Sequence, residues 1–179
     1  MNISYERLNS SNFTGNSLDG FIRHQAVKES WRNISGEWRL VPTEFEENWS
    51  LEECREIACD IARHMEKDQS AFGAFCENEL VGFITVSHEL FGESAKYAEL
   101  VCFQVSEPYR RRGIGRELFR LAVNEMDTIG AAKLYISSQS SKETQAAYRT
   151  LGCVHAREIN REIADGEPFD VQLEYSKDG

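Results

Sequence analysis

Several residue patterns that mark secreted, metal-binding and membrane proteins are missing from this 179-residue sequence. Its five cysteines are odd in number and dispersed without a C-x-x-C pair, which argues against a disulfide framework and a zinc site. The four histidines are equally scattered, so we expect no metal. No window approaches the roughly 18 apolar residues of a membrane span, and no basic start precedes an apolar segment. We therefore expect reduced, mostly buried thiols, no membrane partner and a cytoplasmic location.

Positive charge is also scarce. The chain has 20 Lys and Arg against 30 Asp and Glu, a formal net charge of −10. A protein that tracks phosphates along a nucleic acid normally presents a broad basic surface, so this balance argues against a nucleic-acid partner. No repeat, low-complexity tract or Pro-rich linker marks a boundary, and 41% hydrophobic residues suit a soluble core. We expect one domain over residues 1–179.

A quarter of the cations lie in one short stretch of the chain. The apolar residues 100–105 predict a buried strand, which Ser-Glu-Pro at 106–108 interrupts. Apolar residues then recur at three- and four-residue steps over 114–129, which predicts a helix ended by Gly130. Glycines at the start of that helix allow a tight turn and a close approach of backbone to ligand. The cations are Arg110, Arg111, Arg112, Arg116 and Arg120.

This glycine turn is a candidate anion site. The first amides of a helix point outward at the positive end of its dipole, and clustered arginines add positive charge. Such a turn is often only structural, and a basic run is often a solvated face. The concentration of five arginines in an otherwise acidic chain favours a polyanionic ligand, because these cations repel one another without a compensating anion. We predict a pyrophosphate site at Arg110, Arg111, Arg112, Gly113, Ile114, Gly115 and Arg116.

The turn resembles a known motif. Arg-Arg-Arg-Gly-Ile-Gly at 110–115 is similar to the R/Q-x-x-G-x-G/A acetyl-CoA motif of the GNAT N-acetyltransferase superfamily. Residues 144–153 resemble the family's A-x-x-x-Y-x-x-x-G-F helix ending, and the likeness runs over about 71–154. The resemblance implies acetyl-CoA as cosubstrate and direct acetyl transfer to an amine in a ternary complex. It also implies a splayed central strand whose backbone amides meet the pantetheine and thioester, at Phe103, Gln104 and Val105.

The same resemblance suggests catalytic residues. Tyr148 occupies the position of the tyrosine that protonates the coenzyme A thiolate; a core tyrosine is the structural alternative. Glu99 lies fourteen residues before Gly113, the spacing of the general base in the histone acetyltransferases of the superfamily. Many members use another residue or a water chain, so the identity of the base is left open. Ser141 stands where many members have an asparagine that contacts the pantetheine arm.

The acceptor is expected to be a small cationic amine, such as an antibiotic or a polyamine. Residues 38–53 combine glutamates with aromatic rings, which suits a desolvated ammonium group. Glutamates near a helix start also stabilise that helix, and flanking aromatics are often core. A peptide or protein N-acetyltransferase, or a non-catalytic acyl-CoA-binding module, is the alternative, and a homodimer is left open. The residues are Trp38, Glu44, Phe45, Glu46, Glu47, Trp49, Glu52 and Glu53.

The remaining patterns predict an α/β fold in a single domain, with a mixed, mostly antiparallel central sheet, helices on both faces and a splayed central strand pair. Ser50 and Glu53 form a capping box for a helix to about 64–67, with Leu51 and Ile61 among its inward residues. Another helix is expected to begin after Asp19. Strands are expected at 3–8, 70–76, 80–87, from 97, at 133–138, 153–159 and 170–175, the last two paired, with a helix at 141–151.

Overall fold

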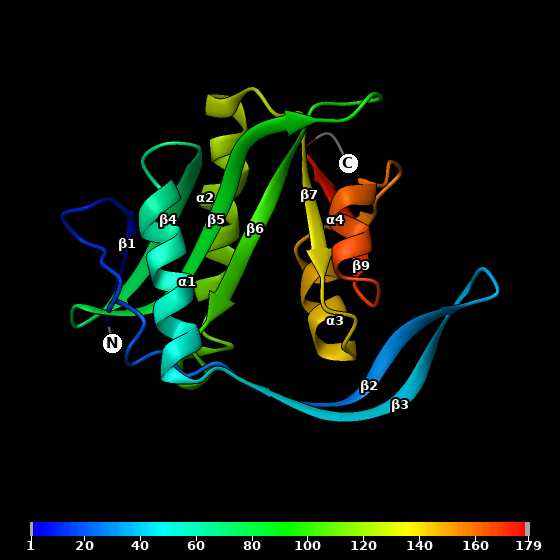
Figure 1. Ribbon diagram of the computed structural model, residues 1–179, viewed down its shortest axis with the longest axis horizontal. Coiled ribbons are helices and arrows are strands. Elements are labelled where there is room, and N and C mark those ends of the chain that lie inside the picture. The colour runs from blue at the N-terminus through cyan, green and yellow to red at the C-terminus, as the bar shows by residue number, and fades with distance from the viewer. Residues whose placement is uncertain (1, 178–179) are drawn as a thin grey trace.

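Seven strands form the central sheet in the order β1-β4-β5-β6-β7-β9-β8 of the computed structural model, which describes residues 2–177 (Figure 1). Neighbouring strands are antiparallel except β6 and β7, which are parallel. The expected mixed, mostly antiparallel sheet is confirmed. The strands are β1 (Ile3–Arg7), β4 (Gln69–Cys76), β5 (Glu79–Phe91), β6 (Tyr97–Val105), β7 (Lys133–Ser138), β8 (Val154–His155) and β9 (Val171–Ser176).

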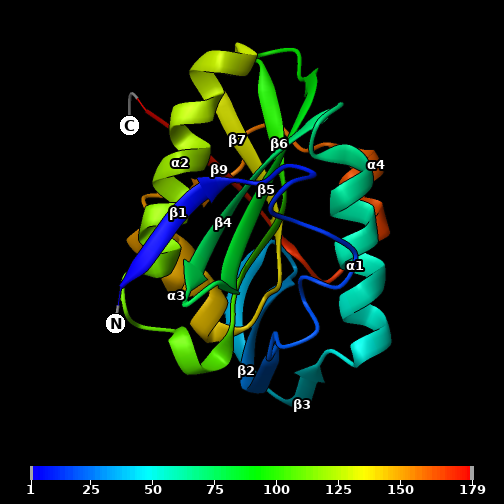
Figure 2. The ribbon, with the colours of Figure 1, turned by 90° about the vertical axis from the view of Figure 1, so that its left-hand side faces the viewer.

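Helices cover both faces of this sheet, as Figure 2 shows. α2 (Ile114–Ile129) and α3 (Lys142–Thr150) lie on one face, and α1 (Leu51–His64) and α4 (Arg161–Gly166) lie on the other. Successive strand residues serve the two faces in turn: Phe83 joins the apolar cluster under α1, and Ile84 joins the cluster under α2. No helix within residues 2–177 is long and apolar enough to cross a membrane.

The sheet opens into a V at its centre. β6 and β7 pair over three residues only, and the last pair is Glu99 with Tyr135. Beyond it the strands diverge, while β6 continues to Val105 along β5 (Figure 1). A bulge leaves Val101 without a partner, because Thr85 pairs with Cys102 and Val86 with Leu100. One edge of β6 is therefore free of ladder bonds over its second half.

The prediction of a helix after Asp19 is wrong. The chain instead forms a long hairpin of β2 (His24–Ile34) and β3 (Glu37–Asn48), which crosses below the open end of the V (Figure 1). Its two-residue turn has positive φ at both Ser35 (54°) and Gly36 (90°), as hairpin turns prefer. Because of a register shift between Val27 and Glu29, the buried residues of β2 are Val27 and Ser30, which lie three positions apart in the sequence. That spacing imitates helical periodicity.

Most other elements follow their local signals, with two differences. The capping box is confirmed: Ser50 N donates to Glu53 Oε2 at 2.7 Å, and Glu53 N donates to Ser50 Oγ at 3.2 Å. Leu51 is 50% exposed rather than inward, because a residue in the first turn precedes the contact with the sheet. The strand expected at 153–159 is only β8, which pairs with β9 as predicted; Asn160 then caps the unexpected α4.

Candidate active site

The glycine turn before α2 has the backbone conformation of an anion nest. Arg111 and Gly113 have positive φ, 61° and 83°. The intrahelical bond from Glu117 N to Gly113 O, at 3.2 Å, is formed by the fourth residue of the helix. The amides of Ile114, Gly115 and Arg116 precede it, so they point out of the helix end. Left-handed residues beside outward amides at a helix N-terminus can make a concave set of donors for an oxyanion.

The protein's own packing does not demand glycine at either position of the motif. A Cβ at Gly113 would meet nothing within 4 Å, although its φ is strained for other residues. A Cβ at Gly115 would lie 3.4 Å from Phe103 Cζ and 3.7 Å from Val105 Cγ2, which are ordinary contacts. The absence of side chains at Gly113 and Gly115 therefore leaves room for a ligand that extends from the start of α2 to β6.

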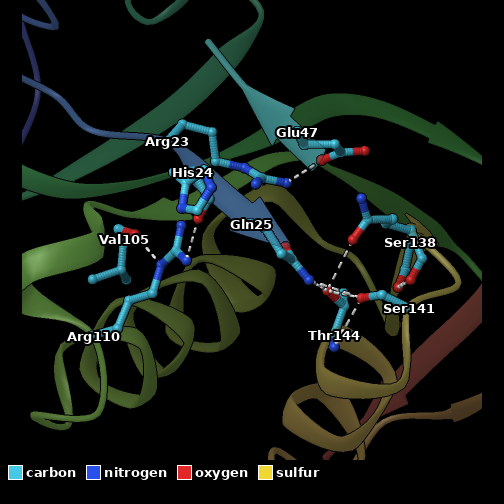
Figure 3. Close-up of polar contacts among 10 residues, drawn as sticks. Arg23, His24, Gln25, Glu47, Val105, Arg110, Ser138, Ser141 and Thr144 are labelled. Carbon is cyan, nitrogen blue, oxygen red and sulfur yellow. Dashed lines mark hydrogen bonds and ion pairs between the residues drawn. The ribbon is translucent and has the colours of Figure 1, made fainter. Parts of the chain in front are cut away.

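The five arginines have different surroundings. Arg110 Nε donates to Val105 O at 3.0 Å and its Nη1 to His24 O at 2.7 Å, so it fastens the end of β6 to β2 (Figure 3). Burial, with the nearby charge of another arginine, lowers the pKa of Arg110. Arg120 forms an ion pair with Glu117 at 2.5 Å. The exposed cations beside the helix amides are Arg111, Arg112 and Arg116, with Arg112 also over the Tyr109 ring at 5.7 Å.

The free edge of β6 presents two amides to the V. Ser106 N donates to Val81 O at 2.9 Å, and N–H directions alternate along a strand. The amides of Phe103 and Val105 therefore point away from β5 toward the open edge. The amide of Gln104 points at β5, so only two of the three expected contacts face the gap.

Tyr148 lies across the gap from this edge. Its ring meets Phe103 edge-on, with centroids 6.2 Å apart and planes at 67°. Among residues 2–177 its hydroxyl has no hydrogen-bond partner. Burial raises the pKa of Tyr148 above its ordinary value, and the charges of Cys153, Cys102 and Asp170 raise it further. The hydroxyl therefore keeps its proton at neutral pH and is available as a proton donor beside Phe103.

Comparison with known proteins agrees with this geometry. A model of the Acetyltransferase (GNAT) family matches residues 27–153. The chain belongs to this family. No curated protein matches the sequence as a relative. The structure is similar to that of a nourseothricin acetyltransferase, with a TM-score of 0.72, 16% identity, and 98% of this chain and 99% of that chain covered.

Two further solved structures share the fold over almost their whole length. One, from Bacillus anthracis strain Ames, is named as a streptothricin acetyltransferase in complex with acetyl coenzyme A; the TM-score is 0.66 at 17% identity, covering 97% of this chain and 96% of that one. The other is the PaiA N-acetyltransferase of Thermoplasma acidophilum in complex with coenzyme A. Its TM-score is 0.61 at 17% identity, covering 98% of this chain and 99% of that chain. The TM-scores and coverage of these three structures show that this chain shares their fold.

Glu99 lies at the closed end of the V in this GNAT acetyltransferase. Ala98 and Leu100 belong to the core under α2, so the side chain of Glu99 points to the opposite face of the sheet. Burial raises the pKa of Glu99, and the charge of Glu89 adds to the shift. The base role expected for Glu99 stays a prediction.

Ser141 is occupied by contacts within the protein. Its hydroxyl accepts from Thr144 N at 3.3 Å and from Gln25 Nε2 at 2.9 Å, and it donates to Thr144 Oγ1 at 2.8 Å (Figure 3). A hydroxyl has one proton and two lone pairs, so these three bonds saturate it, and the residue is fully buried. The expected pantetheine contact is not supported by this geometry. Ser141 instead caps α3 and anchors the hairpin.

The acidic segment before α1 has mainly structural contacts. Glu47 forms an ion pair with the buried Arg23, and Glu53 completes the capping box. Glu46 is largely exposed, with Oε2 3.9 Å from His24 Nε2. Glu44 is exposed on β3. Within residues 2–177, no group of three or more His, Cys, Asp or Glu side chains is placed to hold a metal ion.

Sequence reasoning missed Asp170. Burial raises the pKa of Asp170 to about 6, with Glu167 and then Glu47 adding repulsion that a hydrogen bond from Ser137 partly offsets. No motif surrounds this residue in the sequence, and its neighbours come from β3, β7 and its own loop. Only the folded arrangement brings them together.

Proposed function

We propose that the chain is an acetyl-CoA-dependent N-acetyltransferase that moves an acetyl group to a primary amine of a small cationic molecule by direct transfer. One observation carries the proposal: outward amides at the start of α2, free amides on β6 and the Tyr148 hydroxyl all border the same gap in the sheet. These groups match, in order, a pyrophosphate, a thioester arm and a departing thiolate.

The residues present fit acetyl-CoA. The amides of Ile114, Gly115 and Arg116, with Arg111 and Arg116 as nearby cations, suit its pyrophosphate. The amides of Phe103 and Val105 suit the pantetheine and the thioester oxygen, because a thioester carbonyl gains negative charge during attack and preorganised donors stabilise it.

The reaction transfers one acetyl group and one proton. The amine nitrogen forms a bond to the thioester carbon, and the carbon–sulfur bond breaks. The thiolate takes its proton from Tyr148, whose raised pKa keeps that proton in place until the thiolate forms. The amine loses a proton to a base, for which Glu99 is the candidate from the sequence.

A small cation is the preferred acceptor for two reasons. The formal net charge of −10 attracts cations over distance. The hairpin crosses the open end of the V (Figure 1), and a strand pair in this position favours a small acceptor over a large one. The solved relatives named for nourseothricin and streptothricin support an antibiotic acceptor. A peptide or protein N-terminus is the alternative, because a structure named ribosomal-protein-alanine N-acetyltransferase is similar at a TM-score of 0.56.

The test is release of thiol from acetyl-CoA with a panel of amines: a streptothricin, an aminoglycoside, a polyamine, an N-terminal peptide and a zwitterionic amino acid. We expect turnover with one of the first three. Turnover only with the peptide would establish the alternative acceptor. Tight binding of coenzyme A by calorimetry, without transfer to any amine, would indicate a non-catalytic acyl-CoA-binding module.

A further inference from the structure

We infer that Asp170 is the catalytic residue that accepts the proton of the attacking amine. The inference rests on the proposed function and decides which carboxylate supplies the base.

Asp170 lies on the face of the sheet that carries α1 and α4. Val171 pairs with Ser138 and belongs to the core under α2, so the residues on either side of it, Asp170 and Gln172, point to the opposite face. Ser137 is on that face too, since its Oγ donates to Asp170 Oδ2 at 3.4 Å. Asp170 therefore stands at the open end of the V, on the arm opposite β6.

A short chain of hydrogen bonds orients the carboxylate. Gln172 Nε2 donates to Ser137 Oγ at 2.9 Å, which directs the hydroxyl proton of Ser137 toward Asp170. Arg32 on β2 is also near: its guanidinium lies 5.1 Å from the centroid of the Phe169 ring, next to Asp170 in the chain. Ser137 of β7 thus donates a hydrogen bond to the carboxylate, and the charge of Arg32 on the hairpin acts on it.

The electrostatic surroundings of Asp170 suit a base near neutral pH. Besides burial, Glu167 from its own loop and Glu47 from β3 raise its pKa, while Ser137 and then Arg32 lower it, and the result is about 6. The charge of Asp170 in turn acts on Tyr148. A base on the face of α1 and α4 and an acid on α3 therefore stand close to the same gap, as transfer between an amine and a thioester requires.

Glu99 is less well placed for this role. It lies four residues before Phe103, the ring that Tyr148 contacts, and strand residues rise about 3.3 Å each, so about 10 to 13 Å separate the two along the bulged strand. The groups that share an electrostatic interaction with Glu99 are Glu89 and Tyr135, both away from the open end. Glu99 instead lies at the closed end of the V, in the last pair between β6 and β7.

The proposed step is balanced. The neutral amine attacks the thioester carbon, its nitrogen gives one proton to Asp170 Oδ1 or Oδ2 as the carbon–nitrogen bond forms, and the products are an amide and a thiolate. Tyr148 gives its proton to the thiolate. Solvent then returns the proton of Asp170 to Tyr148 overall, so no oxidant, reductant or further reactant is needed.

The experiment measures kcat from pH 5 to 9 in the wild type, Asp170→Asn, Glu99→Gln and the matched control Glu167→Gln, with the best amine of the panel. The wild-type rate should fall as the pH drops through about 6, because protonated Asp170 cannot act as a base. Asp170→Asn should lower kcat about 10²- to 10⁴-fold and lose this acidic limb, with unchanged affinity for coenzyme A. Glu99→Gln should leave the limb in place, and Glu167→Gln should keep the limb but move it to lower pH, because Glu167 raises the pKa of Asp170.

A positioning variant adds a test that does not depend on Asp170→Asn folding. Ser137→Ala removes the bond that lowers the pKa of Asp170, so its acidic limb should move to higher pH. A limb that stays in Asp170→Asn, a limb lost in Glu99→Gln, or an unshifted limb in Ser137→Ala would overturn the assignment. If the wild type binds coenzyme A but acetylates no amine, the proposed function fails instead.

Discussion

The sharpest prediction concerns a single negative charge placed in the glycine turn. We compare Gly113→Asp with Gly113→Asn. Both side chains tolerate the left-handed region better than other residues do, and a Cβ at this position meets nothing within 4 Å. The two variants therefore share the backbone strain, about 1 kcal/mol of stability, and differ in charge.

The magnitude follows from Coulomb's law. A carboxylate about 4 Å from one phosphate charge repels it by about 1 kcal/mol in bulk water and about 4 kcal/mol near a protein surface. Since 1.4 kcal/mol is tenfold, coenzyme A should bind Gly113→Asp roughly 5- to 700-fold more weakly than Gly113→Asn. The ratio should shrink as salt is raised, because an exposed turn is screened over about 10 Å at 0.1 M salt.

Isothermal calorimetry with coenzyme A at two salt concentrations measures this ratio. Circular dichroism and thermal melting confirm that both variants are folded to the same extent. Equal affinities in the two folded variants would refute a pyrophosphate at the start of α2. A ratio that does not depend on salt would refute the electrostatic explanation and leave a steric one.

Three further outcomes are expected. Tyr148→Phe should lower kcat about 10²- to 10⁴-fold without changing coenzyme A affinity; an unchanged kcat would contradict its role as the acid. Arg110→Ala should reduce the free energy of unfolding by roughly 2 kcal/mol, because two backbone carbonyls lose their donor, whereas Arg116→Ala should stay within about 0.5 kcal/mol and weaken coenzyme A binding. Glu44→Gln with Glu46→Gln should raise the Michaelis constant for a polyamine and flatten its salt dependence, and an unaffected salt dependence would make these glutamates structural.

The parts of the fold that the sequence predicted are those with local signals. The capping box at Ser50, the left-handed Gly130 at the end of α2 and the glycines at the start of that helix each act within a few residues. Their conformations are set by neighbours in the chain, so they can be predicted without knowledge of the rest of the fold. Tyr148 was found in the same way, by its place in a family pattern.

The hairpin and Asp170 were missed for a different reason. The four-residue spacing of Val27 and Trp31 favours a helix in the sequence. In the hairpin a one-residue register shift instead buries Val27 and Ser30, so the strand does not show the alternation that would identify it. The surroundings of Asp170 come from segments more than thirty residues apart, such as Ser137 at 33 positions before it. The occupation of Ser141 by Gln25 is likewise visible only after folding.

The hairpin also governs how the two halves of the sheet are joined. β6 and β7 share only three pairs, while Gln25 and Ser141 are linked across 116 positions of sequence and the backbone of Trp31 donates to Ser140 O at 2.8 Å. Contacts this distant in the chain are the costliest in entropy, so we expect the hairpin to dock late in folding and to release first under mild denaturation. Amide exchange in β2 and β3 should then outpace exchange in β5. The hairpin is then the last element to become ordered, and the separation of β6 and β7 at the open end of the V depends on its contacts with both halves, at Arg110 and at Ser141.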